Sequence, residues 1–126
     1  MDIGDYMKYI EYNTEGNCII RSFNKIYNIN STDIYNELET IKNELNANAS
    51  NDIEVFEEYM KRRNTNKIDK YNDVQVKDLV LDNKEYIVFC YDKKDWYHLI
   101  PIIDNTVYDK TDKCLDLYTI SIYRKD

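Results

Sequence analysis

Histidine, proline and glycine are scarce in this chain of 126 residues, which has one histidine, one proline and two glycines. A single histidine and three cysteines without a Cys-x-x-Cys spacing exclude the usual ligand set of a zinc site. The odd number of cysteines, Cys18, Cys90 and Cys114, favours free thiols over disulfides. We therefore expect a protein without a metal ion or a cofactor.

Long apolar runs and an excess of cations are also missing. No window approaches the roughly 18 apolar residues of a transmembrane helix, and residues 1–5 are acidic and lack the apolar core of a signal peptide. We expect a cytoplasmic protein without membrane contact. The net charge of −7 argues against nucleic-acid binding, which needs a basic face. The length and the lack of Pro/Gly linkers predict one domain over residues 1–126.

Residues 18–27 have the pattern of an amphipathic helix. Asn17 precedes the pattern and is a suitable N-cap. The apolar positions recur at helical spacing and form one stripe: Ile19, Ile20, Phe23, Ile26 and Tyr27.

Two more helices are predicted in the N-terminal half. One begins after Ser31 or Thr32 and continues to about Leu45. The other follows the cap candidate Asp52 and ends in the basic residues 61–63, which suit the negative end of a helix dipole. A single helical turn is expected within residues 73–81.

From residue 85 the period changes from helical to extended. Strands rich in β-branched and aromatic residues are expected at 86–91, 96–103, 106–109 and 117–123. The whole pattern predicts an α+β fold with N-terminal helices packed on a C-terminal antiparallel sheet of about four strands.

Cys18 opens the first predicted helix. On a helical wheel the apolar stripe is centred about 140° away from Cys18, which shares its side with Arg21, Ser22 and Lys25. A thiol at a helix N-terminus lies at the positive end of the macrodipole, which favours the thiolate. Cys18 is therefore a candidate nucleophile. Cys90 lies within an apolar strand and is expected in the core, and Cys114 lies in a polar loop without an evident partner.

His98 is the candidate base for this nucleophile. If Asp104 and Asn105 form a two-residue turn, Ile103 pairs with Thr106, Ile102 with Val107 and Ile100 with Asp109. Side chains alternate along strands, so Asp109 would share a face with His98 and lie diagonally from it. We prefer Asp109 over Asp104 as the group that orients His98. Pro101 can introduce a bulge that would turn Asp109 to the other face.

Acyl transfer also needs hydrogen-bond donors for the developing oxyanion. The backbone N–H of Cys18 is one natural donor. Asn13 and Asn17 are candidates for a second, and Asn13 is preferred because Asn17 is expected to cap the helix.

The two segments resemble motifs of small papain-like cysteine peptidases of phages and mobile elements. Residues 13–22 resemble their opening, an asparagine, a turn, Gly-Asp-Cys, two aliphatics and Arg-Ala. Residues 98–109 resemble their second motif, a His, an aliphatic strand, a tight turn and a strand ending in Tyr-Asp. The order Cys, His, Asp is also that of the peptidase domains that trim bacteriocin leaders. This chain has Asn17 in place of the common Asp and Ser22 in place of Ala, and no glutamine precedes Cys18.

The resemblance implies a papain-like fold and a cysteine peptidase-like hydrolase. Cys18 would attack the carbonyl of a peptide or isopeptide bond, His98 would transfer the proton and Asp109 would orient His98. Acyl transfer to an amine would use the same residues.

A second hypothesis is a non-catalytic acidic module that covers the basic surface of a host protein. The acids that would serve are spread along the helices: Glu37, Glu39, Glu44, Glu54, Glu57 and Glu58.

Overall fold

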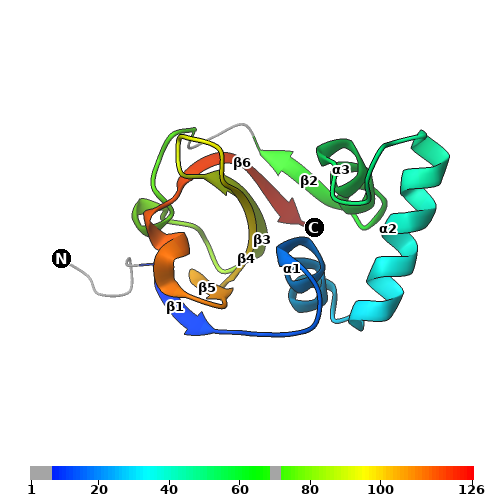
Figure 1. Cartoon of the computed structure of the whole chain (residues 1–126). Coiled ribbons are helices and arrows are strands. Elements are labelled where there is room, and N and C mark those ends of the chain that lie inside the picture. Colours follow the sequence, from blue (N-terminus) through cyan, green and yellow to red (C-terminus); the bar gives the residue numbers. More distant parts are fainter. Residues whose placement is uncertain (1–6, 69–71) are drawn as a thin grey trace.

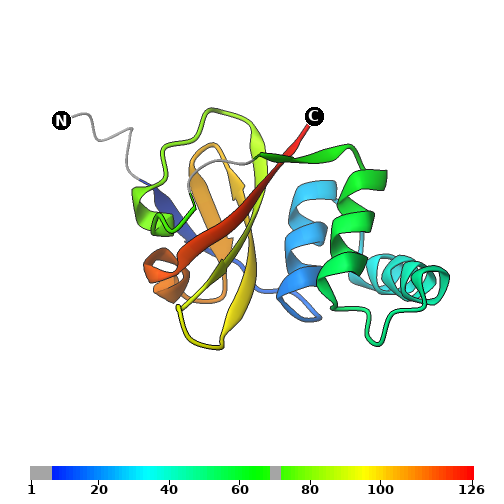
Figure 2. The same cartoon turned by 90° about the horizontal axis from the view of Figure 1, so that it is seen from above.

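A computed structural model describes residues 7–68 and 72–126 of the chain, and the segment considered for a signal peptide, residues 1–5, lies outside the described residues. The fold is α+β, with three helices packed on a six-stranded mixed sheet (Figures 1 and 2). The elements in chain order are β1 (Lys8–Glu11), α1 (Cys18–Tyr27), α2 (Ser31–Leu45), α3 (Ile53–Arg62), β2 (Thr65–Ile68), the 3₁₀ turn η2 (Val76–Asp78), β3 (Glu85–Tyr91), β4 (Tyr97–Ile103), β5 (Thr106–Asp109), the 3₁₀ helix η3 (Asp112–Asp116) and β6 (Tyr118–Lys125).

Helices α1 and α3 begin where the sequence predicts, and α2 begins at Ser31, slightly before the predicted start. The side chain of Asn17 accepts a hydrogen bond from the Ile20 N–H at 3.0 Å and caps α1. Asn30 caps α2 in the same way through the Asp33 N–H. The last turn of α1 closes at Asn28, whose φ of 57° is the left-handed conformation that commonly ends a helix.

The sheet differs from the expected four antiparallel strands. Its strand order is β1-β5-β4-β3-β6-β2, and β1 runs parallel to β5, which makes it mixed. The two unpredicted strands, β1 and β2, have four residues each and lie at the two edges. Short edge strands bury little surface, so their sequences lack the alternation by which the other strands are recognised.

The hairpin between β4 and β5 has the predicted register. Ile103 pairs with Thr106 and Ile102 with Val107, across a turn in which Asp104 and Asn105 both have positive φ. The paired ladder ends there, next to Pro101. The following position in the ladder would require an N–H from Pro101, which proline lacks.

Both faces of the sheet are buried. Alternate residues of β3 and β4 contribute to two separate cores, with Ile87 and Leu99 in the core shared with the helices. Val88 and Ile100 belong to a second core, which the sheet forms with η2, η3 and the surrounding loops. Of the three helices, α1 lies closest to β4, and α2 lies farthest from the sheet (Figure 2). The Ser22 hydroxyl on α1 donates to the carbonyl oxygen of Leu99 on β4 at 2.9 Å.

Candidate active site

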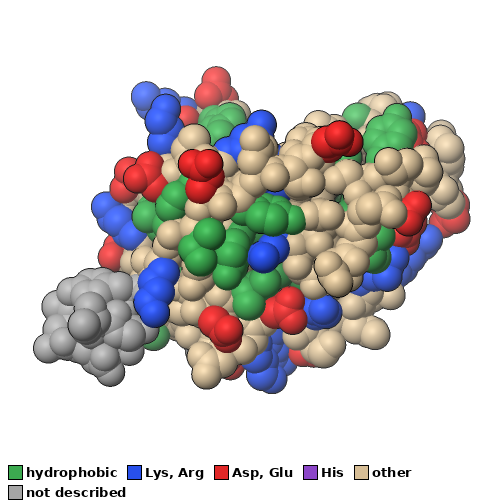
Figure 3. Space-filling view, turned by 90° about the horizontal axis from the view of Figure 1, so that it is seen from below, with side chains coloured by type: hydrophobic (Ala, Val, Ile, Leu, Met, Phe, Trp, Pro, Cys, Tyr) green, Lys and Arg blue, Asp and Glu red, His purple; other side chains and the backbone are tan. Residues whose placement is uncertain are grey.

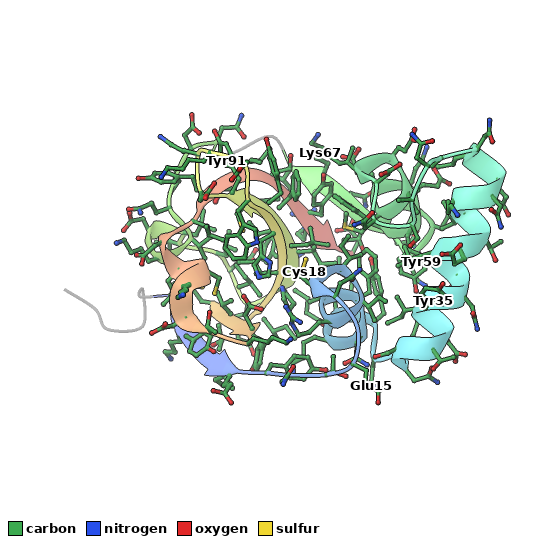
Figure 4. The ribbon with its side chains drawn as sticks, in the orientation of Figure 1. Glu15, Cys18, Tyr35, Tyr59, Lys67 and Tyr91 are labelled. Atoms are coloured by element: carbon green, nitrogen blue, oxygen red, sulfur yellow. The ribbon has the colours of Figure 1, made fainter. Side chains whose placement is uncertain are left out.

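The three residues predicted to form a catalytic triad occupy element ends that meet at one place. Cys18 is the first residue of α1, His98 the second residue of β4 and Asp109 the last residue of β5. In Figure 4 Cys18 lies where the start of α1 meets the sheet. All three side chains line a common cavity.

His98 and Asp109 form a direct buried contact. The imidazole Nε2 of His98 lies 2.7 Å from Oδ2 of Asp109, and the two residues are 8% and 3% exposed. This is the pair expected from the hairpin geometry. Asp104, the alternative, lies in the turn at the opposite end of β5. Since Asp109 occupies Nε2, the imidazole has Nδ1 left for a second partner.

The thiol of Cys18 adjoins the same ring, and the interaction between the two groups acts on the pKa of both. Burial raises the pKa of the Cys18 thiol, but the hydrogen bond and the charge of His98 lower it, as do the Leu99 backbone and Arg21, and the net shift is downward.

The pKa of His98 moves the opposite way. Burial lowers it, but the hydrogen bonds and charges of Asp109 and Cys18 raise it to about 9. Burial also raises the pKa of Asp109, and the hydrogen bond from His98 with the charge of Arg21 brings it below its usual value. A lowered thiol pKa beside a raised imidazole pKa favours a thiolate–imidazolium pair at neutral pH.

The thiol pKa values of the other two cysteines are shifted upward, opposite to that of Cys18. Cys90 is buried in the second core, as predicted, and burial raises the pKa of its thiol well above the ordinary value. Cys114 was expected in a polar loop, but it is buried in η3 and burial raises the pKa of its thiol to about 12. Cys18 is the only one of the three with a lowered thiol pKa and some exposure.

The side of α1 that carries Cys18 faces the sheet. Cys18 is partly exposed, in agreement with its position off the apolar stripe, but Arg21 and Ser22 on the same side are buried. Nη2 of Arg21 lies 3.1 Å from Oδ1 of Asp109. A polar helix side is usually solvated, and here it is buried because each polar group has a partner on the sheet.

Trp96 covers the ring of His98. The two ring centroids are 4.9 Å apart and the planes are inclined by 21°, which is a stacked arrangement. Trp96 is 46% exposed, so its indole lies between the imidazole and solvent. The sequence could have predicted this contact, because Trp96 precedes His98 by two residues and residues i and i+2 of a strand share a face.

Two cavities of different chemistry flank the Cys18–His98 pair. A cavity of about 200 Å³ between α1, α3 and the sheet is mainly apolar and is lined by Cys18, Ile19, Asn51, Ile53, Phe56, Phe89, Tyr97, His98 and Leu99. A more polar cavity of about 340 Å³ is lined by Gly16, Asn17, Cys18, Arg21, Trp96, His98, Asp109, Lys110 and Thr111. A substrate positioned over the sulfur can therefore reach both cavities.

The predicted oxyanion donor Asn13 does not belong to the lining of this site. Asn13 is exposed and lines neither of the two cavities beside Cys18. Two other side-chain amides are better placed, Asn17 in the polar cavity and Asn51 in the apolar one. Asn51 comes from the α2–α3 loop, and its proximity to Cys18 depends on helix packing that no local pattern reveals.

Within residues 7–68 and 72–126, no group of three or more His, Cys, Asp or Glu side chains has the arrangement of a metal site. In the same part of the chain, none of the helices combines the length and apolar character required to cross a bilayer.

Most of the acidic residues considered for binding a basic partner form ion pairs with lysines or arginines of this chain. Five of them form ion pairs, which are Glu37–Arg63, Glu39–Lys42, Glu44–Arg62, Glu57–Lys67 and Glu58–Arg62. Acidic and basic side chains are also interspersed on the face shown in Figure 3, around a group of apolar ones. These contacts are typical of a solvated, internally balanced surface.

Comparisons with known proteins gave no match among family models, curated proteins or solved structures. The interpretation of the site therefore depends on its own geometry.

Proposed function

We propose that this protein is a cysteine-dependent hydrolase that cleaves a peptide or isopeptide bond with Cys18, His98 and Asp109. The observation that carries the proposal is the alignment of these three side chains. Cys18, His98 and Asp109 line one cavity, Nε2 of His98 lies 2.7 Å from Oδ2 of Asp109, and the interaction with His98 lowers the pKa of the Cys18 thiol. This is the relation of nucleophile, base and orienting group that covalent catalysis requires.

In the first half-reaction the thiolate of Cys18 attacks the carbonyl carbon and forms a C–S bond. The imidazolium of His98 gives its proton to the leaving nitrogen as the C–N bond breaks, and the amine departs from a thioester. Asp109 keeps the imidazole oriented and favours its protonated form, which is the acid that this step needs.

In the second half-reaction the neutral His98 takes a proton from water, whose oxygen attacks the thioester. The C–S bond breaks, the product leaves as a carboxylic acid that gives its proton to solvent, and the thiolate–imidazolium pair is restored. An amine in place of water would give acyl transfer by the same steps, so the acceptor that enters the polar cavity decides between the two outcomes.

The negative oxygen formed in both steps needs donors. The N–H of Cys18 belongs to the first turn of α1, whose N–H groups have no acceptor within the helix. The Asn17 and Asn51 amides line the cavities on the two sides of Cys18 and replace Asn13 as the proposed side-chain donors.

The apolar cavity suggests what the substrate carries next to the cleaved bond. Its walls include Ile53, Phe56 and Phe89, and Tyr97 stacks on Phe89 with ring centroids 5.7 Å apart. A branched aliphatic or aromatic side chain would remove this apolar surface from water. Asn51 at the same cavity offers an amide for the substrate backbone.

A papain-like fold is part of the same proposal. Its support is the chain order Cys, His, Asp, with the cysteine at the start of a helix that packs on the sheet and the other two residues on adjacent strands. The ion pairs of the acidic residues weigh against the alternative of an acidic binding module.

The proposal can be tested without a known substrate by comparing the three cysteines of one molecule. We expect iodoacetamide at about pH 6 to alkylate Cys18 at least tenfold faster than Cys90 or Cys114, because Cys18 alone has a lowered thiol pKa. The readout is peptide mass spectrometry of the folded protein. Equal rates at the three positions would overturn the assignment of the nucleophile.

Catalysis itself requires a second experiment. A peptide vinyl sulfone with a leucine or phenylalanine next to the warhead should add to Cys18, and a peptide library should yield hydrolysis products. Both activities should be lost in Cys18→Ala and strongly reduced in His98→Asn. A fast-alkylating Cys18 that neither captures the probe nor cleaves any peptide would leave an activated thiol and exclude the peptidase.

A further inference from the structure

Arg21 is a buried cation one helical turn after the nucleophile. Its residue is 4% exposed, and Nη2 lies 3.1 Å from Oδ1 of Asp109. Residues three apart on a helix share a side, so the same turn of α1 presents the Cys18 thiol to His98 and the guanidinium to Asp109. A buried charge is tolerated only when it is paired, and Asp109 is the partner.

The two oxygens of Asp109 have separate partners. Oδ1 accepts from Arg21, and Oδ2 lies 2.7 Å from Nε2 of His98. The backbone of Asp109 is also fixed, because its carbonyl oxygen accepts from the Tyr9 hydroxyl and the Tyr12 N–H, each at 2.8 Å. A carboxylate held on both oxygens cannot rotate away from the imidazole.

Arg21 also balances the charge of the cluster. A thiolate at Cys18, an imidazolium at His98, a carboxylate at Asp109 and a guanidinium at Arg21 sum to zero. Without the guanidinium, the cluster would carry one net negative charge in a mostly buried place, and the thiolate would be the form that becomes less favourable. The direct influence of Arg21 on the Cys18 thiol has the same sign, since its charge lowers the thiol pKa.

We propose that Arg21 is a positioning residue that orients Asp109 for His98 and offsets its negative charge, so that the thiolate of Cys18 forms at neutral pH. This inference rests on the proposed function only in taking Cys18 as the nucleophile. The guanidinium acts through Asp109 and is not assigned to substrate binding, because it is buried and committed to the carboxylate.

The test measures the pH dependence of Cys18 alkylation in Arg21→Met, which keeps an unbranched side chain that fills part of the same space and removes the charge. In the described part of the chain, these charged and titratable groups surround the cluster: His98 on β4, Asp109 on β5, Lys110 after β5, Tyr9 on β1, Tyr12 after β1, Cys90 on β3 and Cys114 on η3. None of these is changed by the substitution. We expect the midpoint of alkylation to move upward by about one pH unit, which is a tenfold lower rate at about pH 6.

Two controls separate positioning from a structural contribution. Arg21→Lys keeps the charge without the planar fork and should restore part of the shift. Arg124→Met removes an arginine from an exposed ion pair with Asp126, and it should leave the midpoint unchanged. A folded Arg21→Met protein with the wild-type midpoint would overturn the proposal.

If Arg21→Met alone does not fold, the double variant Arg21→Met/Asp109→Asn decides. It removes the buried carboxylate together with its cation, so neither charge is left unpaired and we expect a folded protein. Its Cys18 midpoint should lie above that of Asp109→Asn, which keeps the guanidinium, because the charge of Arg21 lowers the thiol pKa. A double variant whose midpoint equals that of Asp109→Asn would overturn the charge-balance argument. Failure of the proposed function would look different, since wild-type Cys18 would then already react like Cys90.

Discussion

The indole of Trp96 lies stacked on the imidazole of His98, with ring centroids 4.9 Å apart and planes inclined by 21°. The half-exposed indole covers one face of a ring whose two nitrogens are engaged by Cys18 and Asp109. It therefore limits the access of water to two hydrogen bonds that raise the pKa of His98.

Removing the indole of Trp96 should expose the imidazole of His98 and its contacts to water. In Trp96→Ala the relief of burial raises the His98 pKa while the weaker influence of Asp109 lowers it, so we expect a titration midpoint within about half a unit of the wild-type value. The loss in the free energy of unfolding should stay near 1 kcal/mol, since the indole is half exposed. His98 is the only histidine, so its Hε1 proton gives an unambiguous resonance to follow by NMR. Trp96→Phe, which keeps a stacked ring, should titrate like the wild type.

The wild-type titration is a prediction in its own right. We expect the His98 resonance to titrate with a midpoint near 9, because burial, which lowers the pKa, is outweighed by Asp109 and Cys18. Asp109→Asn should bring the midpoint down, since the neutral amide no longer favours the imidazolium. An ordinary midpoint near 6.5 in the wild type would contradict the buried ion pair.

The same shift makes the stability depend on pH. The pKa of His98 is raised from 6.5 to about 9 on folding, so its contribution is fully present below pH 6.5 and is lost as the pH rises through about 9. Between these limits the wild type should lose up to about 3 kcal/mol relative to His98→Gln. Urea unfolding at several pH values measures the difference, and parallel pH curves for the two proteins would contradict it.

Gly16 sets the path of the chain into α1. Its φ is +100°, and a Cβ built on it would lie 2.8 Å from Cγ2 of Ile20. Gly16→Ala should cost about 2–3 kcal/mol of unfolding free energy through strain and the clash. The neighbouring exposed residue offers the control, since Glu15→Ala should change the stability by less than about 0.5 kcal/mol. Chemical denaturation of both variants measures the two changes in unfolding free energy, and equal changes would contradict the prediction.

The apolar cavity should select the substrate. Ile53 lines it, is 48% exposed and opens α3, where an aspartate suits the helix dipole. Ile53→Asp should therefore fold normally and lower kcat/KM about tenfold for peptides with a bulky apolar residue beside the cleaved bond. The matched control is Val80→Asp, an exposed apolar position that does not line this cavity. Equal losses in both variants would mean that the cavity has no part in recognition.

The helix of Cys18 and the hairpin of His98 and Asp109 could be predicted because each depends on local chemistry. Asn17 caps α1 through a contact three residues away, and the positive φ of Asp104 and Asn105 fixes the hairpin register. With the register known, the face shared by His98 and Asp109 follows from strand alternation.

What could not be predicted depends on distant contacts. The periodicity of α1 distinguishes apolar from polar residues, and it predicts that Arg21 is solvated. In the structure Arg21 is paired with Asp109, which lies 88 residues away in the sequence. Asn51 reaches the cavity only because α3 packs against α1 and the sheet. The parallel pairing of β1 with β5 brings together segments about 100 residues apart, for which neither segment carries a local signal.

The nucleophile and its base belong to different layers, since the sulfur comes from α1 and the imidazole from β4, and Ser22 and Leu99 join these elements by one hydrogen bond. Local opening of the contact between α1 and β4 on heating would separate the sulfur from the imidazole while most of the backbone remains ordered. The chemical reactivity of the thiol is thus an early indicator of damage, and it should fade on heating at temperatures where circular dichroism still reports intact helices.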